Sequence, residues 1–263
     1  MGTLKNAPLI EVGFEILWGK VTTSGDMVQK EFTEADRRIY FGEFGIGASA
    51  AGFKHRENMR PIDAVPPHVV LDRYRKGAGR WPCYQTGVGV VTVNQINSGY
   101  EWVTFASDVR VALEILDTCE SLGGLSGLTP VGVELRYQDG FILDSPDAPI
   151  SFLRDKLDFG LKVPDLFHQH QDIAGTASNS RLSFQYETTN PVGHILVDVQ
   201  QALINGRDGY VMNLSLTSGS DNAPNYVIDD LMQWLEKAHT IQQHTFRSLV
   251  KDKYLQILKG EMK

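Results

Sequence analysis

Residues 181–217 read RLSFQYETTNPVGHILVDVQQALINGRDGYVMNLSLT, and apolar and polar side chains alternate through three parts of this stretch. Alternation with a period of two is typical of β-strands that have one dry face and one wet face. Two short links rich in turn-forming residues, 189–193 and 205–209, separate the three parts. Because short links of this kind join antiparallel neighbours, the sequence predicts a three-stranded antiparallel meander.

The same alternation occurs in the first half of the chain, at 10–18 and at 131–138. A weaker hairpin is predicted from 88–95 and 100–105, with its turn at 97–99. Strands of a parallel sheet are buried on both faces and read as unbroken apolar runs. The alternation therefore excludes a doubly wound nucleotide-binding fold.

Two long helices are predicted from apolar residues at helical spacing. The first spans 108–122 and has Ser107 as its N-cap. The second runs over 226–258, and because this exceeds the length of typical globular helices, we expect a break near Lys251. We therefore expect an α+β protein with a mostly antiparallel sheet, helices packed on one face and a long C-terminal helix. Shorter helices are predicted at 33–40 and 150–159, and loops at 42–60, 140–150 and 172–180.

The stretch DSPDAP at 144–149 marks a predicted boundary between two halves of the chain, 1–145 and 146–263. Each half would then pair a sheet with a long helix. A single continuous domain stays open as the alternative, since the chain of 263 residues has the length of one large or two small domains.

The overall composition limits the classes of function. A net charge of -7 argues against general nucleic-acid binding, which needs a cationic surface. Two cysteines, Cys83 and Cys119, are too few for a disulfide framework and suit a reducing compartment. Every apolar run is short and interrupted by charge, so we expect no membrane association and a cytoplasmic location.

Polar residues on the predicted C-terminal helix are the first candidate site. His239 lies at the edge of the apolar stripe and Gln242 near its centre. Because buried polar groups need hydrogen-bond partners, one interpretation is a core pair that fixes how the helix docks on the sheet. The other is a pair that lines a ligand cavity between helix and sheet.

The wet face of the predicted sheet is the second candidate site. If this face has a role, binding of a protein partner or a polar ligand is the natural one, although antiparallel sheets commonly leave one face in water. Glu187 and Asp198 could be neighbouring carboxylates if the strand register brings them together. The residues expected there are Arg181, Gln185, Glu187, His194 and Asp198, with Glu11, Glu15, Glu134 and Arg136 adjacent.

Two further clusters are weaker candidates. A basic and aromatic loop at 73–81 could hold phosphates and stack bases, and its members are Arg73, Arg75, Lys76, Arg80 and Trp81. His168 and His170 have the spacing of metal ligands on a strand, but a catalytic zinc needs three protein ligands. A polar loop is the alternative in both cases, and we expect neither metal nor cofactor.

The segment LKNAPLIEVGFEI at 4–16 resembles the signature L-x-N-A-P-L-x-E-x-x-F-E-I of a sporadically distributed, uncharacterised family of bacterial proteins. The segment 82–105 and the late helix with Trp234, Leu235, His239 and Phe246 are also similar to that family. The resemblance implies one whole family member and patchy inheritance, as with mobile or accessory genes. The family has no assigned activity, so the resemblance implies no catalytic residues.

These observations lead to three hypotheses about function. The first is a non-enzymatic binding or adaptor protein of an accessory bacterial system, such as defence or toxin control, with a protein partner or self-association. The second is a small-molecule binder or enzyme with its cavity near His239 and Gln242. The third is nucleic-acid binding through 73–81, which the acidic balance disfavours. No local catalytic motif occurs, but residues scattered along the chain can still form an active site.

Overall fold

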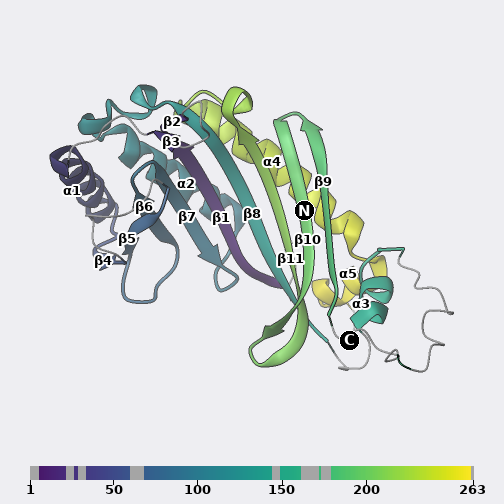
Figure 1. Ribbon diagram of the computed structural model, residues 1–263. Coiled ribbons are helices and arrows are strands. Elements are labelled where there is room, and N and C mark those ends of the chain that lie inside the picture. Colours follow the sequence, from purple (N-terminus) through teal and green to yellow (C-terminus); the bar gives the residue numbers. More distant parts are fainter. Residues whose placement is uncertain are drawn as a thin grey trace.

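An antiparallel sheet of nine strands forms the centre of this computed structural model, in the order β4-β5-β6-β7-β1-β8-β11-β10-β9 (Figure 1). The structure describes residues 6–21, 27–28, 34–59, 68–143, 149–160, 172 and 179–261. A separate two-stranded pair is formed by β2 (Lys20–Val21) and β3 (Met27–Val28). The strands of the large sheet are β1 (Leu9–Trp18), β4 (His55–Asn58), β5 (Val70–Arg75), β6 (Cys83–Gly87), β7 (Val90–Ile96), β8 (Pro130–Ile142), β9 (Arg181–Thr189), β10 (Val192–Ile204) and β11 (Arg207–Gly219).

The helices cover one face of this sheet, which confirms the α+β class (Figure 1). They bury the apolar positions of the alternating strands, such as Phe14 and Ile16 on β1 and Leu214 and Leu216 on β11. None of the described helices is both long and apolar enough to cross a membrane. The helices are α1 (Glu34–Ala50), α2 (Trp102–Asp117), α3 (Pro149–Asp155), α4 (Ile228–Leu249) and α5 (Asp252–Lys259).

The meander predicted from 181–217 is confirmed as β9, β10 and β11, which pair in sequence order. The long C-terminal helix is also confirmed, together with its break. Val250 and Lys251 have extended backbones between α4 and α5. Val250 forms an isolated bridge with Leu157, and the amide of Lys251 donates to the carbonyl of Lys156 at 3.0 Å instead of continuing the helix.

The hairpin predicted from 88–95 and 100–105 is wrong, because the second of these segments is helical. The hairpin partner of β7 is β6, and the two-residue link 88–89 joins them. The helix α2 begins at Trp102, so Ser107 lies inside it rather than at its N-cap. Apolar residues at three- and four-residue spacing, from Phe105 to Leu116, outweigh the local alternation because this spacing buries a whole helix face.

The loop predicted at 42–60 is also wrong. Residues 42–50 belong to α1, and β4 follows at 55–58. The glycines that suggested a loop allow close helix packing instead. A Cβ on Gly45 would lie 3.2 Å from the hydroxyl of Tyr74, and a Cβ on Gly47 would lie 2.7 Å from the Cγ2 of Ile115.

Both halves of the chain contribute to the same sheet. β8 precedes the predicted boundary, and it pairs with β1 on one side and with β11 on the other. The helix α4 from the second half packs against β8 and β11 and against α2 from the first half. The sheet and this helix layer therefore continue across the predicted boundary.

Candidate functional site

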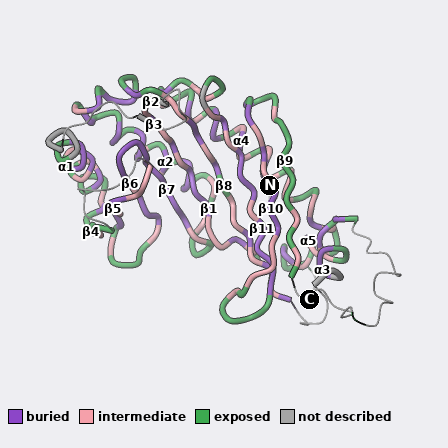
Figure 2. The backbone as a smooth tube through the Cα atoms, viewed as in Figure 1, coloured by how far each residue is buried: buried purple, intermediate pink, exposed green. Residues whose placement is uncertain are grey.

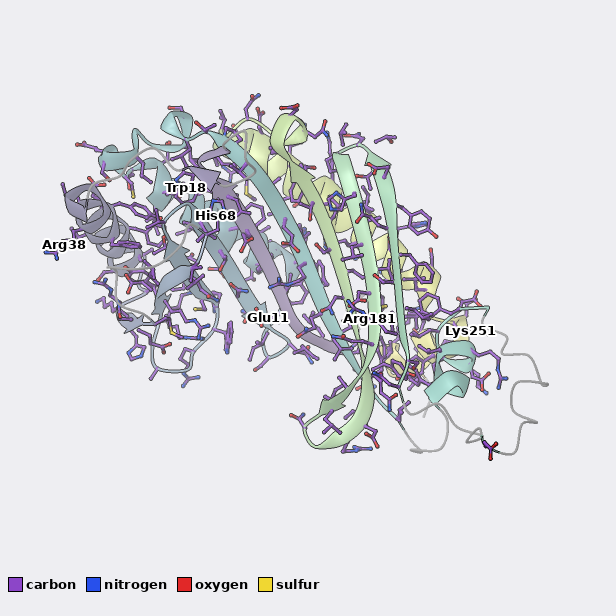
Figure 3. The ribbon with its side chains drawn as sticks, viewed as in Figure 1. Glu11, Trp18, Arg38, His68, Arg181 and Lys251 are labelled. Carbon is purple, nitrogen blue, oxygen red and sulfur yellow. The ribbon has the colours of Figure 1, made fainter. Side chains whose placement is uncertain are left out.

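The face of the sheet opposite the helices carries the polar positions of the alternating strands and is called the open face here. Figure 3 labels two of its residues, Glu11 in the middle of the sheet and Arg181 on the outer strand β9. Burial varies across this face: the middle strands are largely buried, whereas β9 is exposed along most of its length (Figure 2). Polar side chains in the middle of the open face are therefore partly removed from water.

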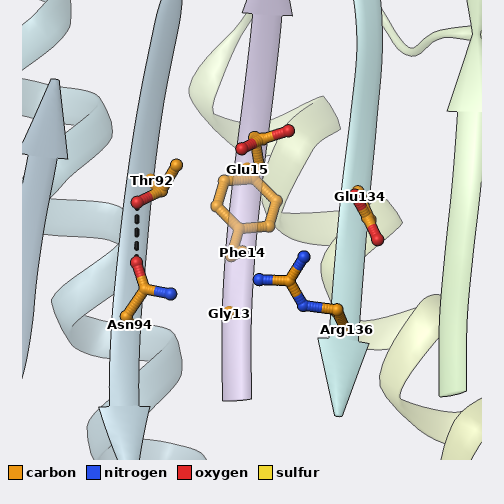
Figure 4. Close-up of a pocket in the computed structure, with 7 residues that line it drawn as sticks. All are labelled: Gly13, Phe14, Glu15, Thr92, Asn94, Glu134 and Arg136. Carbon is orange, nitrogen blue, oxygen red and sulfur yellow. Dashed lines mark hydrogen bonds between the residues drawn. The ribbon is translucent and has the colours of Figure 1, made fainter. Parts of the chain in front are cut away.

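The strand register gathers a cluster of polar side chains around Gly13 in the middle of the open face (Figure 4). Gly13 lies opposite Asn94 of β7 on one side and opposite Arg136 of β8 on the other. Two residues along β1, Glu15 lies between Thr92 of β7 and Glu134 of β8. The two carboxylates of Glu15 and Glu134 are thus direct cross-strand neighbours.

These side chains surround a shallow hollow, and the volume accessible to water inside it is about 20 Å³. Its floor depends on Gly13, because a Cβ there would lie 3.0 Å from Nδ2 of Asn94 and 3.7 Å from a guanidinium nitrogen of Arg136. Pockets for drug-sized ligands span about 300–1,000 Å³. The hollow has room for little more than one water molecule, so it suits the charged tip of a side chain or a single small polar group rather than a larger molecule.

One side of the hollow is held by a hydrogen-bond network around Asn94, which is 5% exposed. Nδ2 of Asn94 donates to Glu11 at 2.6 Å. Its Oδ1 accepts from Thr92 at 2.6 Å and from Gln85 at 3.0 Å. The four side chains of this network lie on the open face of the adjacent strands β1, β6 and β7. The network therefore fixes one wall of the hollow.

The other side of the hollow is less constrained. The hydroxyl of Ser215 donates to Glu134 at 2.5 Å. Within the described part of the chain, Glu15 and Arg136 make no side-chain hydrogen bond, although the charge of Arg136 acts on Glu15. Both groups are therefore available to a ligand.

The carboxyl group of Glu15 is electrostatically unusual. Burial, and to a smaller extent the negative charge of Glu134, raise its pKa from 4.5 to about 7, although the positive charge of Arg136 acts in the opposite direction. Near neutral pH, Glu15 is consequently divided between its protonated and ionised forms. A positive charge placed in the hollow would favour the ionised form.

The five wet-face residues predicted on the meander all lie on the open face, in β9 and β10. Arg181 donates to Asp198 at 2.8 Å and forms an ion pair with it. Glu187 lies opposite His194, and Asp198 lies opposite Ser183, four residues before Glu187. Glu187 and Asp198 are therefore not neighbouring carboxylates. Gln185 lies opposite Leu196, between the pair Glu187–His194 and the pair Ser183–Asp198.

The polar pair on α4 has partners within the protein. Gln242 is 1% exposed and its Nε2 donates to the carbonyls of Leu135 at 2.6 Å and Leu214 at 3.0 Å. The ring of His239 stacks on Trp102 with centroids 3.7 Å apart, and its Nδ1 lies 2.8 Å from the hydroxyl of Tyr137. These contacts favour the core-pair interpretation.

The environment of His239 keeps its imidazole neutral. Burial lowers the pKa of His239 from 6.5 to about 4, and the charge of Arg247 acts in the same direction. The imidazole therefore carries no charge at neutral pH. This neutral form suits stacking on an indole ring and hydrogen bonding to a phenol within a protein interior.

The segment predicted as a basic loop at 73–81 is a loop only in part, because Arg73 and Arg75 lie on β5, and its side chains make internal contacts. Arg75 is 6% exposed, donates to the carbonyl of Arg80 at 3.1 Å, and lies 4.3 Å above the ring of Trp81. Arg73 donates to Gln85 at 3.4 Å, and the amine of Lys76 lies 5.1 Å above the ring of Phe53. Lys76 and Arg80 are exposed.

His168 and His170 lie outside the described residues. Among the residues that are described, no group of three or more His, Cys, Asp or Glu is placed to hold a metal ion.

Sequence reasoning named Glu11, Glu15, Glu134 and Arg136 as neighbours on the wet face but missed Gly13, Thr92 and Asn94. Thr92 and Asn94 alternate with Val91 and Val93, which was the available signal. Their part in the site depends on β7 pairing with β1, and sequence spacing does not report this pairing.

Comparison of the chain with protein-family models, curated proteins and solved structures found no match. The resemblance of 4–16 to the bacterial signature therefore stays a prediction, and the interpretation of the site depends on its geometry.

Proposed function

We propose that this chain is a cytoplasmic, non-enzymatic binding or adaptor protein that holds a protein partner on the open face of its sheet. The observation that carries the proposal is the hollow over Gly13, where Glu15 and Arg136 face solvent-accessible space without a hydrogen bond in the described chain. The proposed setting is an accessory bacterial system, such as defence or toxin control, and this setting depends on the sequence resemblance.

The charges around the hollow indicate what the partner presents. Glu15 and Glu134 lie side by side and match a lysine or arginine side chain, because a cation between them relieves their mutual repulsion. Arg136 next to them is matched by a carboxylate or a carbonyl of the same partner. A protein surface offers both groups at this spacing, and arginine is enriched at protein interfaces.

The size of the hollow also favours a protein partner over a small molecule. A water-accessible volume of about 20 Å³ accepts only the tip of one side chain, while the polar groups of adjacent strands continue beyond it over the open face. The alternative cavity near His239 and Gln242 is disfavoured by the hydrogen bonds and stacking that both residues make inside the protein. Nucleic-acid binding through 73–81 is disfavoured because Arg75 is committed to internal contacts.

A second candidate function is acid–base chemistry on a small polar ligand in the same hollow. It is favoured by the pKa of Glu15, about 7, because a general acid or base is most effective when its pKa lies near the working pH. This candidate needs a ligand that binds without a protein partner. The binding-protein proposal needs a partner that is lost when the charge of the hollow is reversed.

The test is affinity purification of the tagged full chain from its native host, with the captured proteins identified by mass spectrometry. The Arg136→Glu substitution reverses the only cationic group among the residues lining the hollow. Lys253→Glu on the exposed side of α5 is the matched control, since it also reverses one cationic side chain but lies away from the open face. We expect the wild type and the control to retain the same partner, encoded by a neighbouring gene, and Arg136→Glu to lose it.

Equal capture by all three proteins would show that the open face is not the binding surface. A wild-type protein that is isolated alone from its native host would reject the adaptor function. A captured partner should also bind more tightly as the pH rises above 7, because ionised Glu15 is the form that attracts a cation.

A further inference from the structure

The outer edge of the large sheet is formed by β9, whose exposed residues include two large aromatic side chains. Phe184 is 37% exposed and Tyr186 is 63% exposed. Within the described chain, β9 pairs with β10 on one side, and no strand pairs with its other side (Figure 1). An exposed strand edge presents unpaired backbone groups that can add a further strand.

The direction of these unpaired groups follows from one hydrogen bond. The amide of Gln201 donates to the carbonyl of Ser180 at 3.2 Å, so Ser180 points toward β10. Backbone groups alternate sides along a strand. The even-numbered residues of β9 therefore bond to β10, and the odd-numbered residues from Arg181 to Thr189 point toward the free edge.

The sequence of this edge is complementary to itself when reversed. In the segment RLSFQYE at 181–187, an antiparallel copy centred on Phe184 places Arg181 opposite Glu187 and Leu182 opposite Tyr186. Ser183 then lies opposite Gln185. Opposed residues lie on the same face of a sheet, so charge meets opposite charge on the open face and apolar meets aromatic on the helix face.

The hydrogen-bonding pattern agrees with this alignment. The outward-pointing residues, 181, 183, 185 and 187, would oppose one another as hydrogen-bonded pairs, giving about eight main-chain hydrogen bonds at two per pair. Phe184 would meet its own copy as a non-hydrogen-bonded pair, in which side chains approach most closely. A shift by one residue would lose both the bonds and the charge match.

Several of the usual protections of an edge strand are missing from β9. Its nine residues, RLSFQYETT, contain no lysine, proline or glycine, and its register with β10 has no bulge. At the opposite edge of the sheet, β4 is only four residues long. This strand also carries the charged side chain of Arg56, which forms an ion pair with Asp72 at 2.7 Å. A short strand with a charged side chain is a protected edge.

We propose that the β9 edge is the dimer interface for a second copy of this chain, which pairs antiparallel about a two-fold axis at Phe184. The two sheets join into one, and the two open faces are on the same side. Glu187 has no ion-pair partner in the described chain and is free to meet Arg181 of the second copy. The inference is independent of the function proposed above, since it uses β9 and leaves the hollow over Gly13 free.

Charge-swapped variants test the alignment. Glu187→Lys places two cationic residues on each edge, and Arg181→Glu places two anionic ones, so each variant alone should be monomeric in sedimentation equilibrium. When the two are mixed, both opposed pairs become complementary and a heterodimer should form. Asp198→Asn is the matched control: it removes the internal ion-pair partner of Arg181 but should leave the wild-type dimer intact.

Disulfide cross-linking provides a second measurement that does not depend on charge. The Cα atoms of opposed Phe184 residues would lie about 4.5 Å apart, within the range that a disulfide spans. Two copies of Tyr186 would be offset by four residues, or about 13 Å, which is too far. Phe184→Cys should therefore form a covalent dimer under mild oxidation and Tyr186→Cys should not, while the native cysteines are buried.

The inference is overturned if the wild type is monomeric at every concentration tested and Phe184→Cys does not cross-link. It is also overturned if a wild-type dimer is unaffected by the charge reversals, because another surface would then be responsible. Equal cross-linking at 184 and 186 would reject the proposed register. Circular dichroism of each variant separates loss of the dimer from loss of the fold, and heterodimer formation on mixing shows that both swapped chains are folded.

Discussion

Replacing Glu15 by glutamine should change how the stability of the protein depends on pH. Glu15 is partly buried next to Glu134, and folding raises its pKa from 4.5 to about 7. Below pH 4.5 the group is protonated in both the folded and the unfolded chain, so it causes no penalty. Between 4.5 and 7 the unfolded chain ionises first, and the stability of the fold declines as pH rises. Glutamine has no proton to lose and removes this decline.

The magnitude follows from the two pKa values. A tenfold difference in acidity corresponds to 1.36 kcal/mol, so the change from 4.5 to about 7 corresponds to about 3 kcal/mol in the free energy of unfolding. Since Glu15 is not fully buried, solvent reduces this figure, and we expect about 2–3 kcal/mol above pH 7. Glu15→Gln should then be more stable than the wild type by this amount above pH 7, relative to any difference below pH 4.5.

Urea denaturation at a series of pH values, from below 4.5 to above 7, measures this difference by linear extrapolation. The difference between variant and wild type cancels other groups that titrate in the same interval. Glu114→Gln, which changes an exposed carboxylate on α2, is the control for loss of a charge. A difference between Glu15→Gln and wild type that stays constant with pH would refute the reasoning.

Three further substitutions test other parts of the structure. Gly13→Ala should lower the free energy of unfolding by about 1–2 kcal/mol in urea denaturation, because its Cβ would displace Asn94; unchanged stability would mean that the wall of the hollow can shift freely. Gln242→Leu should lower it by about 1–3 kcal/mol, since two buried carbonyls lose their side-chain donor, whereas equal stability would contradict a docking role. Burial raises the pKa of Asp139 to about 7. Asp139→Asn should therefore be more stable than the wild type by up to about 4 kcal/mol above pH 7, and no more stable below pH 3.8. A variant that is more stable than the wild type only below pH 3.8 would contradict this reasoning.

The two proposals together describe a bivalent platform. Two open faces on the same side of a joined sheet would present two hollows to one large partner or to a dimeric partner. Linking two binding sites in this way raises the apparent affinity without any new contact. A monomeric variant such as Glu187→Lys should then retain the hollow but bind a dimeric partner more weakly than the wild type, which surface-bound partner assays can measure.

Local patterns in the sequence determined the long strands of the sheet and the side that each of their residues faces. Period-two alternation identified β1, β8 and the β9–β11 meander, because every second side chain had to be apolar to meet the helices. The excessive length of the predicted C-terminal helix identified the break near Lys251. Where two local signals competed, as at 100–105 and 42–50, the burial of a whole helix face decided the outcome.

Only the tertiary structure decided which residues form a site. Gly13, Asn94 and Arg136 come from three strands far apart in sequence, and their contact depends on long-range pairing that local spacing does not encode. The same pairing separates Glu187 from Asp198 and brings Glu15 next to Glu134. The raised pKa of Glu15 is likewise a tertiary property, since burial and a neighbouring charge from another strand produce it.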